Sequence, residues 1–391
     1  MATRVAHSDA RSDVASDVTT FLRHVDYLLL AAVGGLVAYG LWVLSTVTAD
    51  DVTGDPGYYV VRQAFSVALG VAALAVVLAV DPAVYRRYRN LLYGAAIGLM
   101  AFVFVAAPLT RGSRRWIDLG FFRFQPSELG KLIFIVFLAG FLADRGKRVT
   151  EGKTTFAAVG LAAIPIVLVF LEPDIGTALI YAGAVAAVLF LAGTRWLHLA
   201  VLGLVAALVA LAVLWLLPSA GLQVLQPYQQ DRLVGFLHPD SDPQGATYNQ
   251  NQSITAVGSG GVSGRGVSGA TQTRLDYLPE HATDFVFSSL AEQRGFLGAS
   301  VLLLLYAVVA WRGIKIVSIA PDLFTAVVAG AIVVAFLLQV FINIGMTIGI
   351  APITGITLPF MSYGGSSIVT SMLMIGVLSA IHVRGRLAPR P

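Results

Sequence analysis

Long apolar runs separated by short polar segments recur along this 391-residue chain. Most runs are close to 20 residues, the length that an α-helix needs to cross the hydrocarbon core of a bilayer. The alternating pattern of membrane β-barrel strands is absent. The pattern therefore predicts an all-α polytopic membrane protein with ten transmembrane helices, at residues 26–48, 60–80, 90–109, 126–143, 155–172, 175–193, 196–217, 284–312, 323–347 and 364–384.

Polar segments set the limits of this predicted ten-helix domain, residues 23–384. Residues 1–22 are too polar to contain a signal peptide and are expected to form an N-terminal tail, and residues 385–391 a C-terminal tail. The segment 218–283, between the seventh and eighth spans, is too long for a simple connection and is expected to be a large extracellular loop. The polar, Gly-rich stretch 248–298 is expected to form the wall of a catalytic cavity.

Basic residues predict the orientation of the spans. With the N-terminus inside, sixteen of the 26 Lys and Arg residues fall on inner segments, as is typical of cytoplasmic loops. Both termini are therefore expected to be cytoplasmic. Five of the other ten lie between residues 111 and 131, in a segment expected outside. That excess of positive charge favours an anionic ligand at the outer surface, although a loop that contacts lipid phosphates is the alternative.

Composition excludes several classes of function. Hydrophobic residues make up 57% of the chain and charged residues 12%, about half the charged fraction of a typical soluble protein. The basic isoelectric point, near 9.3, is explained by Lys- and Arg-rich cytoplasmic loops rather than nucleic-acid binding. No cysteine is present, so disulfides, thiolate metal sites and Cys nucleophiles are excluded. The Gly-rich run 258–266 lacks the Lys-Ser/Thr ending of a P-loop, so no nucleotide is expected.

Ionisable residues at the edge of the predicted eighth span are the first candidates for chemistry. Asp284 opens this span, and Thr283 is the expected N-cap. Asp284, Ser288 and Glu292 recur every four residues, which predicts a polar stripe on one helix face. Such groups are costly in a membrane unless they face a wet cavity or a partner. For Glu292 and Arg294, a role in helix packing is an equally good interpretation.

Three other outer segments carry polar groups. Glu172 and Asp174 flank a proline in a short turn, and they are either ordinary loop residues or a cation-binding corner. Glu128 and Lys131 are three residues apart, so they share a helix face and are expected to pair. The uncharged Gly- and Pro-rich loop 350–367 either lines a cavity or forms a structural plug.

Several short motifs together resemble the SEDS family (shape, elongation, division and sporulation), and the resemblance covers all ten predicted spans. The motifs are Arg115-Trp116-Ile117, Gln125-Pro126-Ser127-Glu128, Pro173-Asp174-Ile175-Gly176-Thr177-Ala178, Leu278-Pro279-Glu280 with Thr283-Asp284-Phe285, and Leu358-Pro359 with Ser362-Tyr363-Gly364-Gly365-Ser366-Ser367. Within the family, two motifs are more similar to the RodA branch than to the FtsW branch: Asn343-Ile344-Gly345-Met346 and Pro352-Ile353-Thr354-Gly355.

Two positions depart from the family pattern. Ala282 stands where the family has a His before Thr-Asp, and His281 comes one residue earlier, so a direct role for this His is not carried over. Glu172 stands where Gln is common, which adds a negative charge near Asp174. The acidic residue of the motif is retained as Asp284.

The resemblance implies a peptidoglycan glycosyltransferase that polymerises lipid II at the outer face of the bacterial cytoplasmic membrane, for cell elongation and shape. It also implies a class B penicillin-binding protein as the transpeptidase partner. Sugar transfer from a lipid pyrophosphate needs a base, for which Asp284 is the candidate, and cations that stabilise the leaving group. A divalent cation, Mg or Mn, is a further expectation, with Asp174 or Glu128 as its ligands. The expected substrate-binding residues are Arg115, Trp116, Arg123, Gln125, Ser127, Glu128, Lys131, Gln252, Ser253, Arg265, Glu280, Ser362, Tyr363, Ser366 and Ser367.

Two other functions fit the same residues. A flippase that moves lipid-linked precursors without chemistry would also need a polar cavity with basic residues. A scaffold that only recruits the penicillin-binding protein would need neither a base nor a binding cavity. A transferase alone depends on the carboxylate of Asp284 for polymerisation.

Overall fold

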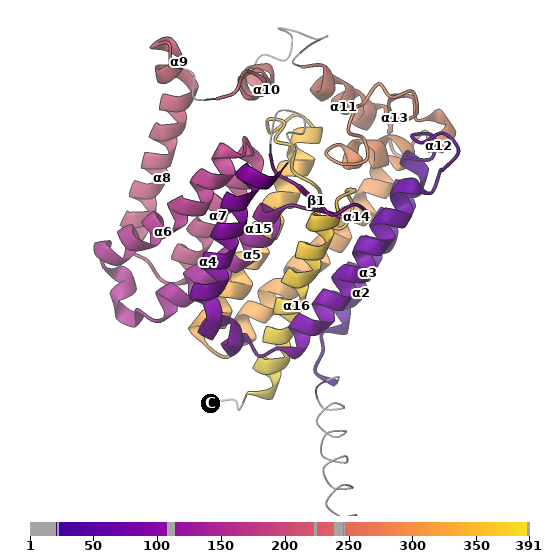
Figure 1. Ribbon diagram of the computed structural model, residues 1–391. Helices are drawn as coiled ribbons and strands as arrows, with labels where there is room; N and C mark the ends of the chain where they lie inside the picture. Colours follow the sequence, from indigo (N-terminus) through magenta and orange to yellow (C-terminus); the bar gives the residue numbers. More distant parts are fainter. Residues whose placement is uncertain are drawn as a thin grey trace, which may run out of the picture.

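The computed structural model describes residues 21, 23–107, 114–222, 225–237, 245 and 247–388, and this part of the chain is almost entirely helical (Figure 1). The predicted N-terminal tail, apart from residue 21, and residues 389–391 of the C-terminal tail lie outside the described residues. The long helices are α2 (Tyr27–Val47), α3 (Tyr58–Ala79), α4 (Pro82–Ala106), α5 (Pro126–Ala143), α6 (Gly152–Leu171), α7 (Ile175–Leu191), α8 (Trp196–Leu211), α14 (Val286–Ile319), α15 (Leu323–Thr347) and α16 (Gly365–Leu387).

The predicted fold class, an all-α polytopic membrane protein, is confirmed. Nine of the described helical segments are long and apolar enough to cross a membrane, counting α8 with its continuation to Ser219 as one. The helix α7 is apolar but has only 17 residues. The count of ten spans therefore stays a prediction. The two ends of the described chain lie at the same end of the bundle (Figure 1).

Acidic N-caps explain where several helices begin. Asp26 accepts a hydrogen bond from the backbone N–H of Leu29 at the start of α2, and Asp81 caps α4 in the same way. Asp174 caps α7, and Asp322 forms a capping box with Thr325 at the start of α15. These side chains satisfy backbone donors that a helix cannot satisfy itself, so each acidic residue before an apolar run fixes a boundary.

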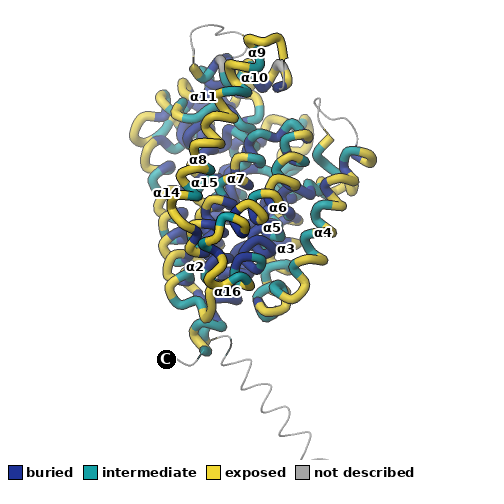
Figure 2. Tube along the Cα trace, turned by 90° about the vertical axis from the view of Figure 1, so that its left-hand side faces the viewer, coloured by how far each residue is buried: buried dark blue, intermediate teal, exposed yellow. Residues whose placement is uncertain are grey.

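Three helices form the centre of the bundle. Most residues of α5, α15 and α16 are buried, whereas no residue of α8 is (Figure 2). Helix α16 packs against α3, α14 packs against α2 and α15, and α4 packs against α5. Helices α3 and α7, which carry site residues described below, thus pack directly on this centre.

The start of the eighth predicted span differs from the sequence-based expectation. Helix α14 begins at Val286, with Phe285 as its N-cap, and it runs to Ile319 rather than to residue 312. The side chain of Thr283 donates to Glu280 and caps nothing, so the predicted N-cap is wrong. Asp284 lies in the turn before the helix, and the predicted stripe with Ser288 and Glu292 does not form.

An intrusion of the outer loop breaks α14 at Gly295, which has φ +64°. The backbone of Gly261 accepts from the N–H of Phe296, and the N–H of Arg265 donates to the carbonyl of Glu292. A β-carbon on Gly295 would lie 2.3 Å from the amide nitrogen of Gly264, so only glycine fits this crossing. The loop replaces the helical hydrogen bonds lost at the break.

The β1–β2 hairpin and the helices of the outer loop lie at the other end of the bundle from the described chain ends (Figure 1). A short antiparallel pair, β1 (Ile117–Asp118) and β2 (Arg123–Phe124), was not predicted from the sequence. The predicted large loop contains four short helices: α10 (Pro227–Leu237), α11 (Tyr248–Ser259), α12 (Gly266–Gly269) and α13 (Thr271–Arg274).

Candidate active site

A cavity of about 690 Å³ opens at the end of the bundle that carries β1 and β2. It is lined from α3, the β1–β2 hairpin, α5, α7, α10, the turn before α14 and the loop before α16. Of the residues predicted for the site, eleven line it: Arg115, Trp116, Arg123, Gln125, Glu128, Asp174, Glu280, Asp284, Tyr363, Ser366 and Ser367.

Asp284 faces this cavity from a turn that is held on two sides. Asn343 of α15 donates from Nδ2 to the backbone carbonyl of Asp284 at 2.9 Å and to that of Ile356 at 2.6 Å. The N–H of Tyr363 donates to the carbonyl of Ala282 at 2.9 Å. No described residue hydrogen-bonds the Asp284 carboxylate itself, which is partly exposed to the cavity. The backbone is therefore fixed while the carboxylate is left available.

The surroundings of Asp284 raise its pKa to about 6. Burial is the largest cause, because a charged carboxylate is poorly solvated there, and the nearby Glu280 adds to it. Arg232 of α10 acts in the opposite direction and lowers the pKa. The group is thus ionised at neutral pH yet more basic than an ordinary aspartate.

Gly355 allows Asp284 and Arg232 to face each other. A β-carbon on Gly355 would lie 3.4 Å from Oδ2 of Asp284 and 3.5 Å from Nη1 of Arg232. Its φ of +74° is also one that glycine tolerates best. Arg232 was not predicted as a site residue, because the segment that contains it has no periodicity that would place it.

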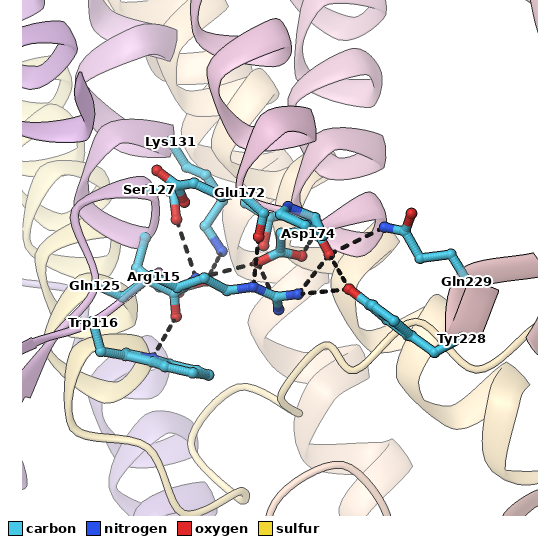
Figure 3. Close-up of polar contacts among 12 residues, drawn as sticks. Arg115, Trp116, Gln125, Ser127, Lys131, Glu172, Asp174, Tyr228 and Gln229 are labelled. Carbon is cyan, nitrogen blue, oxygen red and sulfur yellow. Dashed lines mark hydrogen bonds and ion pairs between the residues drawn. The ribbon is translucent and has the colours of Figure 1, made fainter. Parts of the chain in front are cut away.

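The guanidinium of Arg115 hydrogen-bonds the backbone of the turn between α6 and α7 (Figure 3). Nε donates to the carbonyl of Glu172 at 2.8 Å, Nη2 donates to that of Pro173, and Nη1 lies 3.6 Å from Oδ2 of Asp174. Tyr228 also donates to the Pro173 carbonyl, at 3.0 Å. Arg115 thus lines the cavity, but its hydrogen bonds hold protein backbone.

The predicted pair of Glu128 and Lys131 is confirmed, with Nζ and Oε1 2.8 Å apart. Lys131 also donates to Gln339 of α15 at 3.2 Å and is only 3% exposed. It does not line the cavity, and its charge is matched by Glu128. Lys131 therefore links α5 to α15 and adds no free cation to the cavity.

The two carboxylates predicted as metal ligands do not fit that role as they are arranged. Asp174 accepts from the N–H of Thr177 at 2.9 Å and from Gln125 at 3.2 Å, beside Arg115. Glu128 is paired with Lys131. Within the described residues, no group of three His, Cys, Asp or Glu side chains is arranged to hold a metal ion. The divalent cation stays a prediction, and no step below depends on it.

The cavity has a second cation-rich side, of which Arg123 was predicted from the sequence and Arg62 was not. The guanidinium of Arg62 in α3 lies 4.4 Å from the ring centre of Tyr58 and 5.1 Å from that of Phe121. Arg123 lines the same cavity, and its side chain is 68% exposed. A signal for Arg62 was present, because a lone charge inside an apolar span usually marks a functional or wet position.

The remaining predicted residues lie outside the cavity. From the stretch 248–298, only Glu280, Thr283 and Asp284 line it, so the prediction that the whole stretch forms its wall is wrong. Ser253 is buried in hydrogen bonds to Ser288 and the Thr347 carbonyl, and Ser362 bonds the Thr283 carbonyl and the Leu358 N–H. The others outside the cavity are Ser127, Gln252 and Arg265.

Glu292 and His281 support the packing of the outer loop. The carboxylate of Glu292 accepts from the N–H groups of Gln272 and Thr273, at 2.8 and 3.0 Å. His281 joins Asp51, at 3.1 Å, to the outer turn and does not line the cavity. These hydrogen bonds agree with the role in packing that was one of the two interpretations of Glu292.

Glu172, beside the site, has a raised pKa that makes the stability of the protein depend on pH. Burial, together with Asp174, raises the pKa of this carboxyl to about 8. Because the pKa of Glu172 is higher in the folded than in the unfolded protein, where it is about 4.3, the protonated carboxyl contributes fully to stability below pH 4.3. This contribution to the free energy of unfolding is lost as the pH rises through 8. Glu172→Gln should therefore raise the melting temperature by several degrees at pH 9 and change it little at pH 5. An equal change at both pH values would contradict this assignment.

Comparisons with known proteins were consistent across sequence and structure. The family model described as "Cell cycle protein" (FtsW, RodA and SpoVE) matches residues 23–387. Stage V sporulation protein E of Bacillus subtilis is 38% identical, over 90% of this chain and 93% of its own. Peptidoglycan glycosyltransferase MrdB of Escherichia coli is 35% identical, over 93% of this chain and 95% of its own.

Two solved structures resemble the fold described above. A chain of a peptidoglycan synthase complex, described as coordinating polymerization and crosslinking, superposes with a TM-score of 0.79 at 29% identity, over 92% of this chain and 98% of the other. The Thermus thermophilus rod shape determining protein RodA superposes with a TM-score of 0.68 at 28% identity, over 93% of this chain and 98% of the other.

Proposed function

Because the chain belongs to the SEDS family of FtsW, RodA and SpoVE and is a peptidoglycan glycosyltransferase, we propose that it polymerises lipid II with Asp284 as the general base. The observation that carries this proposal is the Asp284 carboxylate. It faces an open cavity, has no hydrogen-bond donor among the described residues, and lies beside Arg232. The assignment to elongation rather than division stays a prediction, since SpoVE, MrdB and FtsW relatives match at similar identity.

The proposed step forms one glycosidic bond and breaks one bond to phosphate. A hydroxyl oxygen of the acceptor sugar attacks the anomeric carbon of the donor, and its proton passes to Asp284. The bond from that carbon to the lipid pyrophosphate breaks, and the pyrophosphate leaves with the electron pair. General base catalysis contributes roughly 10²–10⁴-fold, so charge stabilisation of the leaving group must supply more.

Three arginines line the cavity and supply positive charge for that stabilisation, and one of them, Arg123, also lies 3.6 Å from Asp118 in an exposed ion pair. Arg232 lies next to Asp284, while Arg62 and Arg123 lie on the other cation-rich side of the same cavity. Their charges favour the departing phosphates in a site partly shielded from water. We assign Arg115 a supporting role, because its donors hold the Glu172–Asp174 turn.

The proposed location is the cytoplasmic membrane of a bacterium, with the cavity at the outer face. Both ends of the described chain lie at the opposite end of the bundle. Sixteen of the 26 Lys and Arg residues fall on segments assigned to that side, and this bias supports a cytoplasmic position for it. The relative found in a complex for polymerization and crosslinking supports a class B penicillin-binding protein as partner.

The pH dependence of polymerisation follows from the Asp284 pKa. A general base acts only when it is deprotonated, so the rate should be constant above pH 7 and fall tenfold per pH unit below about 6. Glycan formation from purified lipid II, measured between pH 4.5 and 8.5, checks this. A rate that stays flat down to pH 5 would rule out a base with this pKa.

The proposed function itself is tested with the purified chain and its partner. The partner's transpeptidase is blocked with a β-lactam, so only glycan polymerisation remains. Linear glycan strands from lipid II support the proposal. Transport of lipid II across a vesicle membrane without any polymer would support a flippase instead.

A further inference from the structure

A second cavity, of about 390 Å³, lies where the described chain begins and ends. Those chain ends lie at the opposite end of the bundle from β1 (Figure 1). The cavity lies between the start of α2, the later part of α14 and the end of α16. Its polar lining is strongly basic, with three arginines and two histidines against a single carboxylate. These residues are Arg23, His24, Asp26, Arg312, His382 and Arg386.

One of the three arginines is already neutralised. Asp26 is 3% exposed and accepts from Nε of Arg312 at 2.8 Å and lies 2.6 Å from its Nη2. Asp26 also caps α2 through the Leu29 N–H. This buried pair joins α2 to α14 and neutralises the one carboxylate found among the described lining residues of the cavity.

The other two arginines keep their charge. Arg23 and Arg386 are exposed, and neither forms an ion pair with any residue in the described ranges. They come from opposite ends of the sequence, and the fold brings both to the rim of one cavity. Two unmatched guanidinium groups so placed favour an anion between them.

A buried histidine lacks a hydrogen-bond partner at the same place. His382 is 4% exposed and lines the cavity, and its Nδ1 has no partner among the described residues. Oδ2 of Asp26 lies 3.7 Å from this nitrogen, which is beyond hydrogen-bonding distance. Buried polar atoms are nearly always satisfied, so an unsatisfied nitrogen facing a basic cavity indicates a ligand.

Exposed apolar and aromatic side chains form part of the rim of the cavity. Tyr27 and Leu28 line it and are 61% and 48% exposed. Trp311, next to Arg312, is 49% exposed and has Lys315 Nζ 4.4 Å from its ring centre. Aromatic and basic residues in this arrangement are typical of the membrane–water interface.

We propose that this second cavity binds the phosphate of an anionic phospholipid, held by Arg23, Arg386 and His382, with the acyl chains along the exposed rim. A phosphate diester carries the charge that the arginines match and an oxygen that accepts from His382. Basic cavities between helices at the cytoplasmic side commonly bind anionic headgroups. A soluble phosphate shares the charge but would leave the apolar rim unused.

The test uses the purified full-length protein in neutral detergent with phosphatidylglycerol, phosphatidylcholine or sodium phosphate. Bound lipid is counted by native mass spectrometry, and stabilisation is followed by thermal melting. The variant R23Q/R386Q is compared with K147Q/R148Q, which removes two exposed charges from the same predicted face outside the cavity. All four side chains are exposed, so folding should be unaffected.

Phosphatidylglycerol should bind wild type and K147Q/R148Q more tightly than phosphatidylcholine does. In R23Q/R386Q its affinity should fall about 25-fold, since each arginine near a phosphate contributes a factor of about five. Equal losses in the two double variants would show diffuse charge attraction and overturn the site. Sodium phosphate that binds and stabilises as well as phosphatidylglycerol would overturn the lipid assignment.

Discussion

Replacing Asp284 by asparagine should reduce glycan polymerisation by about 10²–10⁴-fold. The substitution keeps the shape of the side chain and removes only its capacity to accept a proton. The backbone contacts from Asn343 and Tyr363 that hold the turn are unchanged by it. The rate of glycan formation at saturating lipid II and pH 7.5 is the measurement.

Loss of folding should not explain this effect. The raised pKa of Asp284 means that its ionised form lowers the stability of the folded state above pH 6, so asparagine should leave the melting temperature equal or higher at pH 7.5. Asp276→Asn is the matched control, because Asp276 belongs to the same outer segment, is exposed and does not line the cavity. Its activity should match wild type. A similar loss in both variants would point to a general effect on the outer loop.

Arg232→Gln should lower the maximal rate by about 10²–10³-fold, the usual cost of removing one group that stabilises developing charge. It should also shift the acid limb of the pH–rate profile to higher pH, because Arg232 lowers the pKa of Asp284 in the wild-type protein. Rates measured at pH 8.5 separate the two effects, since Asp284 is ionised there in both proteins. The loss that remains at pH 8.5 reports on leaving-group stabilisation.

Arg274→Gln controls for the loss of a positive charge from the outer segment. Arg274 and Asp50 form an exposed pair 3.5 Å apart, and such pairs contribute little. This variant should keep the wild-type rate and pH midpoint. An unchanged pH profile in Arg232→Gln would show that the guanidinium does not act on Asp284.

The sequence predicted the helices well where local signals are strong. The bounds of α5 and α15 agree with the predicted spans, because Pro126 starts one and the capping box of Asp322 starts the other. The break at Gly295 and the start of α14 depend on contacts from elsewhere in the chain. Local periodicity continues through them, so it predicted one unbroken helix from Asp284.

The candidate site was predicted only in part for the same reason. Asp284 came from its position at a span edge and from the SEDS resemblance. Arg232, whose charge acts on Asp284, lies in α10, a helix that the sequence does not mark. Asn343 donates to the Asp284 backbone carbonyl from α15. Lys131 and Arg115 have the predicted charge, but buried partners commit them to structure. Charge counts along a loop cannot show which cations remain free.

The most direct test measures lipid II binding and glycan formation in one sample of the purified complex, for wild type and Asp284→Asn. We expect both proteins to bind lipid II equally and only wild type to form glycan at an appreciable rate. Glycan formation by Asp284→Asn at the wild-type rate, with binding unchanged, would contradict the role of Asp284 as the base.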